Sequence, residues 1–274
     1  MHDNVDPAEG AALSPVHTLG KYKGDPDFMA SLARGLLVIG AFSKQRRRQT
    51  IADLARHTSL PRATVRRCLY TLKALGYVDN DDNLYHLKPK VLTLGYAYLS
   101  STDLAVTAQP FLEQVSNEVN ESCSLAVLEN DTILYVGRSP TKRVMSVVLT
   151  VGSRLPAYCS SMGRVILAAK TPAQRQAYYE RVKLLPLTEH TVYKPEALEP
   201  LLQQAATQGY ALVNQELELG LCSLAVPVRN LLGETVGAIN ISTHASRFNE
   251  EAMLTQLLPA LRRAATDLSA QLGL

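Results

Sequence analysis

Residues 50–76 read TIADLARHTSLPRATVRRCLYTLKALG, and this stretch decides the fold of the first third of the chain. Thr50 followed three residues later by Asp53 approximates a capping box, which predicts that a short helix begins here. Pro61 suits the first position of a second helix, and Gly76 suits the position that ends it. Two helices joined by a short turn are typical of a helix-turn-helix.

The flanking residues extend this motif to a winged helix-turn-helix domain over residues 28–88. Apolar residues recur at helical spacing over residues 29–43, which predicts a preceding helix. Two short β-like runs, residues 77–78 and 84–87, flank a cluster of Asn and Asp and predict a hairpin. Residues 1–27 show little periodicity and are expected to form a flexible tail.

The charge of the chain is divided unevenly along its length. The 274 residues include 28 Lys and Arg and 25 Asp and Glu, which gives a formal net charge of +3. Residues 34–73 contain ten of the basic residues and one acid, Asp53, and therefore carry +9. The remaining 18 basic and 24 acidic residues leave −6. Such asymmetry points to nucleic acid as the partner of the basic segment, although a solvated helical face produces a similar run of charge.

The second helix of the motif supplies the candidate DNA contacts. If Val65 and Leu69 face the core, the arginines around them point outward, where the start of this helix reaches base edges in the major groove. Arginine matches guanine bidentately, and Thr or Ala can contact a thymine methyl group. Arg67, the basic loop before Gln49, and Lys88 are expected to contact phosphates. The candidate DNA-binding residues are Arg46, Arg47, Arg48, Arg62, Ala63, Thr64, Arg66, Arg67 and Tyr70.

After the winged domain the hydrophobic pattern predicts a linker helix over residues 91–101, within a linker of residues 89–102, and then an α+β domain over residues 103–274. Its first helix should be kinked or broken near Pro110. An antiparallel sheet with helices beside it is expected. The predicted strands are residues 123–129, 132–138, 144–150, 210–214, 222–229 and 236–243, and the predicted helices are residues 103–120, 160–170, 172–182, 195–208 and 249–272.

Two segments of this second domain are expected to border a ligand cavity. Gly152 and Pro156 flank a tight loop, and CSSMG leads from Cys159 into a helix whose exposed N–H groups would attract an anion. The loop over residues 215–221 would fold over the same cavity. The serines serve equally as a helix cap, the cysteines equally as core thiols, and Arg138 is a further candidate. The candidate effector-binding residues are Arg154, Tyr158, Ser160, Ser161, Gly163, Asn214, Glu216, Cys222 and Leu224.

Several classes of protein are excluded by what the chain lacks. No apolar run is long enough to span a membrane, and the N-terminus does not have the pattern of a secretory signal, so a cytoplasmic location is expected. The four cysteines are widely spaced and form no CxxC pair. No nucleophile elbow, Walker loop, GxGxxG or HExxH is present, so no catalytic residue, metal or cofactor is predicted.

Three motifs together resemble one family. TIADLA with LPRATVRRCLYTLKALGYV, starting at Thr50 and Leu60, is similar to the DNA-binding domain of the IclR family of bacterial transcription regulators. GSRLPAYCSSMGRVILA from Gly152 and NQELELGLCSLAVPV from Asn214 resemble two signatures of that family's effector domain. Within the family, the chain looks most like the PcaU/PcaR/PobR group, whose members regulate the catabolism of aromatic acids. The resemblance covers the chain from about Met29 to its C-terminus.

The resemblance implies a GAF- or profilin-like effector domain and a ligand-responsive activator. The implied effector is a small aromatic or dicarboxylic acid such as 4-hydroxybenzoate, protocatechuate or β-ketoadipate. The implied partners are a double-stranded DNA operator, this effector, further copies of the chain as a dimer or tetramer, and RNA polymerase. Three alternatives stay open: a repressor of another carbon-source pathway, an enzyme with a basic oligomerisation domain, and an architectural DNA-binding protein that responds to no ligand.

Overall fold

The structure is a computed structural model that describes residues 19–43, 45–95, 103–141 and 149–272. The chain divides into two compact units between residues 101 and 102, and each unit is described by itself. Residues 1–18 of the predicted tail lie outside the described residues. In the remaining part of that segment, the ring of Tyr22 stacks on Phe28 with 4.9 Å between centroids.

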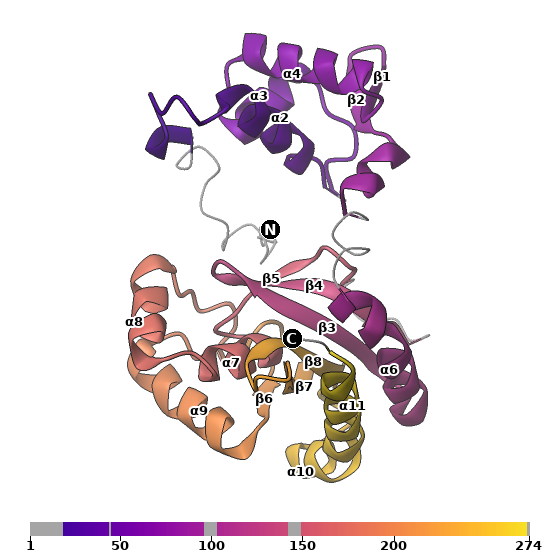
Figure 1. The fold of residues 1–274 in the computed structure, drawn as a ribbon, viewed down its shortest axis with the longest axis vertical. Helices are drawn as coiled ribbons and strands as arrows, with labels where there is room; N and C mark the ends of the chain where they lie inside the picture. Colours follow the sequence, from indigo (N-terminus) through magenta and orange to yellow (C-terminus); the bar gives the residue numbers. More distant parts are fainter. Residues whose placement is uncertain (1–18, 44, 96–102, 142–148, 273–274) are drawn as a thin grey trace. The chain divides into compact units, whose positions relative to one another are not determined.

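The N-terminal unit is a winged helix-turn-helix, as predicted (Figure 1). Its elements are α2 (Ala30–Gly40), α3 (Ile51–Thr58), α4 (Arg62–Ala74), β1 (Val78–Asp81) and β2 (Leu84–Leu87). The predicted capping box forms, because the Asp53 N–H donates to Oγ1 of Thr50 and the Thr50 N–H donates to the Asp53 carboxylate. Ser59, with φ of 52°, ends α3 in the left-handed region. Val38, Leu54, Val65 and Leu69 form a buried core between the helices.

The turn of the hairpin is shorter than the five-residue Asn/Asp cluster, residues 79–83, from which it was predicted. Asp79, Asn80 and Asp81 belong to β1, so only Asp82 and Asn83 form the turn. Asp82 takes a φ of 52°, which a short polar side chain tolerates better than most, so the turn forms without glycine. After β2, a short 3-10 turn (Pro89–Val91) leads into helical residues 92–95. The rest of the predicted linker helix lies outside the described residues.

The C-terminal unit is built on a six-stranded antiparallel sheet, as expected. The strand order is β5-β4-β3-β8-β7-β6. The strands are β3 (Ser122–Glu129), β4 (Thr132–Ser139), β5 (Arg154–Pro156), β6 (Ala211–Asn214), β7 (Leu221–Arg229) and β8 (Thr235–His244). Of the predicted strand over residues 144–150, positions 144–148 lie outside the described residues and the last two are not strand. The strand that pairs with β4 is instead β5, which follows the turn at Gly152, where φ is 91°.

Helices cover both faces of this sheet (Figure 1). On one face lie α6 (Asp103–Val119) and α11 (Leu258–Gln271), which contact β3, β4, β7 and each other. On the other face lies α7 (Ser161–Ala168), which contacts β3, β4, β6, β7, β8 and α9 (Pro195–Gln208). The helix α8 (Pro172–Arg181) places Tyr178 in the same core as α7 and α9. The side chains enclosed by α7 and the sheet are therefore separated from those beneath α6 and α11.

Pro110 and Pro259 each affect one helix of this unit. A kink or a break was expected near Pro110, and α6 continues through it without a break. Pro110 has no N–H, so the carbonyl of Val106 loses its hydrogen bond within the helix. Both residues lie on the exposed side of the helix, where water can hydrogen-bond to that carbonyl instead. The predicted final helix contains α10 (Glu250–Ala252), a π-helical turn (Met253–Leu257) and α11. Pro259 has no N–H for the carbonyl four residues earlier, which accounts for the wider turn just before it.

Candidate functional site

The residues of α4 chosen from the sequence divide between two sides of that helix. Arg62, Arg66 and Tyr70, spaced four residues apart, lie on one exposed face, and the side chain of Tyr70 is 79% exposed. Ala63 at the start of the helix is also exposed. Thr64 and Arg67 instead line an apolar groove between α2 and α4 with a volume of about 540 Å³. One α4 face is thus basic and aromatic, and the neighbouring face is largely apolar.

The basic loop between α2 and α3 is held by Gln49, a residue that the sequence analysis did not select. Its side chain is 2% exposed. Its Nε2 donates to the Ala41 carbonyl at 3.0 Å, and its Oε1 accepts from Nδ1 of His57 at 2.7 Å. Its backbone exchanges two hydrogen bonds with Tyr85 of the wing, of 3.0 and 2.8 Å. A single glutamine therefore joins the ends of α2 and α3 to the wing. The only signal in the sequence was its place directly before the helix cap.

Acidic residues of the wing pair with part of the basic set. Arg48 lies 2.9 Å from a carboxylate oxygen of Asp81. Asp79 lies 3.0 Å from the ammonium of Lys73 and 3.7 Å from that of Lys88, and the hydrogen bond from Lys73 lowers the pKa of Asp79 to about 2. Among the described residues, no carboxylate pairs with Arg47, Arg62 or Arg66. Arg46 is half-buried and so is less accessible to DNA. The charge available to phosphates is therefore concentrated in the loop tip and the exposed face of α4.

In the C-terminal unit, the start of α7 borders a cavity between that helix and the sheet. We call it the α7 cavity; its volume is about 20 Å³, which is room for roughly one water molecule. Ser160 caps α7, because its Oγ accepts from the Gly163 N–H at 3.3 Å. The hydroxyl of Ser161 is buried and has no partner among the described residues. The lining residues are Tyr135, Leu149, Leu155, Cys159, Ser160, Ser161, Met162, Val213, Leu217, Leu221, Ser223, Asn240 and Ser242.

Three of the candidate effector residues are placed outside this cavity by the pleat of the sheet. Successive residues of a strand point to opposite faces of the sheet. Because Ser223 lines the cavity, its neighbours Cys222 and Leu224 point to the opposite face. Cys222 donates from Sγ to Oδ1 of Asn214 at 2.8 Å on that side. Leu224 is completely buried. On these strands the α7 cavity is lined by the neighbours of the residues that the sequence analysis selected.

Gly163 has a different role from the one expected. A Cβ at this position would lie 2.2 Å from the carbonyl oxygen of Ala157, so only glycine lets the chain before α7 pack on the helix. Arg154 lies on β5, where its guanidinium pairs with the carboxylate of Glu129 and donates to Oγ1 of Thr132 at 3.0 Å. Neither residue lines the α7 cavity.

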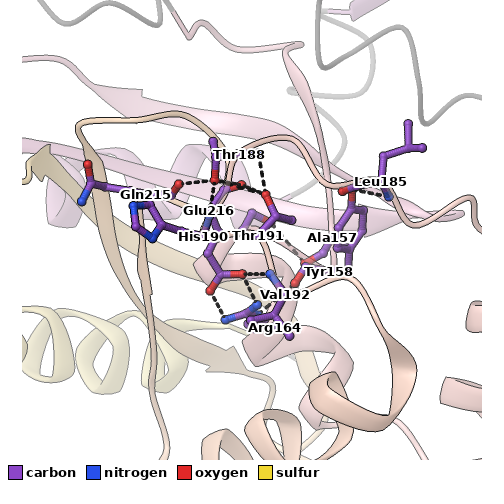
Figure 2. A network of polar contacts seen from close by, with 11 residues as sticks. Ala157, Tyr158, Arg164, Leu185, Thr188, His190, Thr191, Val192, Gln215 and Glu216 are labelled. Atoms are coloured by element: carbon purple, nitrogen blue, oxygen red, sulfur yellow. Dashed lines mark hydrogen bonds and ion pairs between the residues drawn. The ribbon is translucent and has the colours of Figure 1, made fainter.

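Glu216 is held in a buried ion pair with Arg164, which the sequence analysis missed (Figure 2). The two guanidinium nitrogens of Arg164 donate to the two carboxylate oxygens at 2.7 and 2.5 Å. The side chains are 4% and 9% exposed. Nε of Arg164 donates to the Tyr158 carbonyl at 2.9 Å, and the Val192 N–H donates to the Glu216 carboxylate at 2.9 Å. The signal for Arg164 was a lone arginine in an otherwise apolar helix.

The segment between α8 and α9 is fixed against the same pair (Figure 2). Oγ1 of Thr188 donates to the Gln215 carbonyl at 2.7 Å, and Oγ1 of Thr191 donates to the Glu216 carbonyl at 2.6 Å. The hydroxyl of Tyr158 donates to the Leu185 carbonyl at 2.8 Å and accepts from its N–H at 3.0 Å. Tyr158 and Glu216 therefore join the segments around the cavity to one another.

The polar residues of the cavity that the sequence analysis missed lie on the central strands. Asn240 and Ser242 on β8 alternate with apolar residues, a pattern that marks one face of a strand. Nδ2 of Asn240 donates to Oγ of Ser242 at 3.0 Å, and Oδ1 of Asn240 is buried without a partner among the described residues. Burial raises the pKa of the Cys159 thiol to about 12, so this cavity residue is a protonated thiol at neutral pH.

Two general features of the described residues complete the picture of the site. The described part of the chain contains no group of three or more His, Cys, Asp and Glu side chains arranged to hold a metal ion. Across the same residues, no helix combines the length and apolar composition that a membrane span requires.

Comparison with known proteins assigns both units to one family. Residues 31–82 match the IclR helix-turn-helix domain, and residues 96–270 match the C-terminal domain of the bacterial transcriptional regulator IclR. The Pca regulon regulatory protein of Pseudomonas putida is 49% identical over 98% of this chain and 96% of its own. The p-hydroxybenzoate hydroxylase transcriptional activator of Acinetobacter baylyi is 34% identical over 88% of this chain and 91% of its own. The crystal structure of an IclR homologue from Microbacterium hydrocarbonoxydans, complexed with 4-hydroxybenzoate, superposes with a TM-score of 0.76 at 28% identity, over 88% of this chain and 98% of that chain. The chain therefore belongs to the IclR family of bacterial transcriptional regulators.

Proposed function

We propose that this regulator activates genes for the catabolism of aromatic compounds when a small aromatic or dicarboxylic acid binds in the α7 cavity. The observation that carries the proposal is the cavity itself, where apolar walls surround two buried polar atoms without partners, Ser161 Oγ and Asn240 Oδ1. Buried polar groups are normally hydrogen-bonded, so a ligand that displaces the lining side chains and satisfies both atoms gains these two hydrogen bonds.

The chemistry of the cavity suits a flat acid with polar ends. Tyr135, Met162 and Leu217 offer apolar contact for a ring or a short carbon chain. The N-terminal end of α7 adds the positive end of a helix dipole, which favours an anionic or partly negative group. The relatives' names support the class, since one is an activator of p-hydroxybenzoate hydroxylase and a homologue was crystallised with 4-hydroxybenzoate.

In this proposal residues 28–88 bind the operator, residues 89–102 link, and residues 103–274 sense the effector. The exposed face of α4 enters the major groove, where Arg62 and Arg66 contact base edges. The loop arginines contact phosphates, with Arg47 foremost because it has no carboxylate partner among the described residues. The regulator acts in the cytoplasm, where its operator lies, and RNA polymerase is the partner that activation requires.

Self-association is the third part of the proposal. The groove between α2 and α4 exposes Leu32, Leu36 and Leu75 by 58%, 55% and 52%, although large side chains of this kind are usually buried. A second copy of the chain would cover this surface, giving a dimer or a tetramer of dimers that reads two half-sites spaced by whole turns of DNA. The effector then acts by favouring one arrangement of the two DNA-binding units, which requires different affinities for the two arrangements.

A calorimetric titration with 4-hydroxybenzoate, protocatechuate and β-ketoadipate tests the sensing role. We expect at least one acid to bind with a Kd below about 1 mM, or roughly −4 kcal/mol. Ser161→Ala should weaken that binding by about 2- to 10-fold through the loss of one hydrogen bond. Thr207→Ala, an exposed change on α9, serves as the control. Failure of all three acids to bind the full-length protein would refute the assignment of the effector class.

Footprinting tests the DNA-binding role separately. A discrete protected site is expected on promoter DNA, with binding that weakens steeply as salt concentration rises, because several phosphates are neutralised. Uniform coverage with no protected site would instead support an architectural DNA-binding protein.

A further inference from the structure

Arg138, near the end of β4, is a partly buried cation that pairs with no carboxylate among the described residues. Its two guanidinium nitrogens donate to hydroxyls only, to Ser124 Oγ at 3.2 Å and to Ser122 Oγ at 3.4 Å. Within the described residues, therefore, no carboxylate neutralises this guanidinium.

Arg138 differs in this respect from the other buried or half-buried arginines of the C-terminal unit. Burying a guanidinium removes its hydration, and this cost is normally offset by a carboxylate. Serine hydroxyls can accept hydrogen bonds from Arg138 but supply no charge. Burial correspondingly lowers the pKa of Arg138, the direction expected when the charged form is poorly solvated. The paired arginines are Arg154 with Glu129, Arg164 with Glu216, and Arg175 with Glu199.

The strand register places Arg138 on the face of the sheet that lines the α7 cavity. Arg138 lies opposite Ser124 in the β3–β4 pair, and Ser124 lies opposite Asn240 in the β3–β8 pair. Ser122 lies opposite Ser242. Residues directly opposite one another on paired strands share a face, and both Asn240 and Ser242 line the cavity. Arg138 does not itself line the cavity, but by strand register it shares one sheet face with Ser122 and Ser124 on β3 and with Asn240 and Ser242 on β8.

We propose that Arg138 is the specificity-determining residue that binds the carboxylate of the effector. This inference rests on the proposed sensing function and deepens it, since it assigns the recognition of the acid group to one side chain. A guanidinium presents two parallel N–H donors to the two oxygens of a carboxylate anion. An ester or an amide of the same acid carries no negative charge and therefore binds a guanidinium more weakly. The regulator should therefore discriminate the free acid from its neutral derivatives, and this discrimination should depend on Arg138.

The experiment compares the wild-type protein with Arg138→Met, Arg138→Lys and the control Arg263→Met. Arg263 is an exposed arginine on α11 that pairs with Glu118, so its replacement removes the same charge far from the cavity face. Each full-length protein is titrated calorimetrically with 4-hydroxybenzoate, protocatechuate and β-ketoadipate, and with the methyl ester of the acid that the wild type binds best. Thermal unfolding is recorded in the absence of ligand.

Arg138→Met should weaken binding of the acid by roughly 10- to 150-fold, the range expected for hydrogen bonds to a charged group, and leave binding of the ester unchanged. Arg138→Lys should retain only part of the affinity, because it keeps the charge and loses the two parallel donors. Arg138→Met should also unfold at a higher temperature than the wild type without ligand, since an uncompensated buried charge is gone. A purely structural role for Arg138 predicts the opposite shift in unfolding temperature.

The outcomes separate this inference from the proposed function. If the wild type binds none of the acids, the proposed effector class fails. If the wild type binds an acid and Arg138→Met binds it equally well, or loses acid and ester alike, the role of Arg138 is wrong while the sensing function stands. Should Arg138→Met fail to fold, Arg138→Gln, which keeps hydrogen-bond donors toward Ser122 and Ser124, takes its place in the same comparison.

Discussion

Removing one partner of the buried Arg164–Glu216 pair should destabilise the C-terminal unit strongly. In Glu216→Ala, the Arg164 guanidinium stays buried and loses two charge-assisted bonds, of 2.7 and 2.5 Å, while the Val192 N–H loses its acceptor. Leaving one charge of a buried pair uncompensated costs about 3–5 kcal/mol. For a unit of this size, about 2–4 °C of unfolding temperature is lost per kcal/mol. We therefore expect a fall of roughly 6–20 °C.

A double-mutant cycle distinguishes the ion pair from simple loss of packing. The singles Glu216→Ala and Arg164→Met and the double variant are unfolded in urea, and the free energies of unfolding are compared. Because the double variant leaves no unpaired charge, its loss should be smaller than the sum of the two single losses by about 2–3 kcal/mol. The reasoning is refuted if Glu216→Ala costs less than about 1 kcal/mol, or if the two losses add.

Three further predictions concern other parts of the chain. Arg66→Ala should relax sequence specificity on operator DNA, whereas Arg47→Ala should weaken all sequences alike and reduce the salt slope by about 1, as electrophoretic mobility shifts at several salt concentrations would show. The pKa of Asp79 is lowered to about 2, so the stability that its ionised form provides is present above the ordinary pKa near 4 and is lost as the pH falls toward 2; Asp79→Asn should remove that part of the pH dependence in acid unfolding curves. Gly163→Ala would place a Cβ 2.2 Å from the Ala157 carbonyl oxygen and should cost about 1–3 kcal/mol or more in urea unfolding, and an unchanged midpoint would contradict the packing role.

Local patterns in the sequence were sufficient for most elements of the fold. The helix over residues 195–208 begins at a proline and ends before Gly209, which takes the left-handed φ of 73°, so both ends carry a physical signal. The capping box at Thr50 is another such signal. The break that was one alternative at Pro110 does not occur, because the penalty of an internal proline depends on whether water reaches the carbonyl that loses its bond. Solvent exposure is a property of the folded chain rather than of its local sequence.

The α7 cavity is lined in part by the two segments that the sequence analysis chose, although mostly by other side chains within them. Ser160 and Ser161, which were selected because a helix start carries a local signal, do line this cavity. Choosing Cys222 over Ser223 required knowing which strand face meets α7, and a shift of one residue reverses that choice. Arg164 and Glu216 are 52 residues apart, so no local pattern joins them. The local sequence patterns therefore did not predict side-chain contacts between segments that are far apart in the chain.

The contacts of Gln49 have a consequence for the entropy of DNA binding. Its side chain and backbone fix the loop of Arg46–Arg48 to the ends of α2 and α3 and to the wing before any DNA is present. A loop that is already ordered gives up little conformational freedom on binding, so more of the interaction energy of its arginines appears as affinity. Association with the operator is then expected to proceed largely as the docking of a preformed surface.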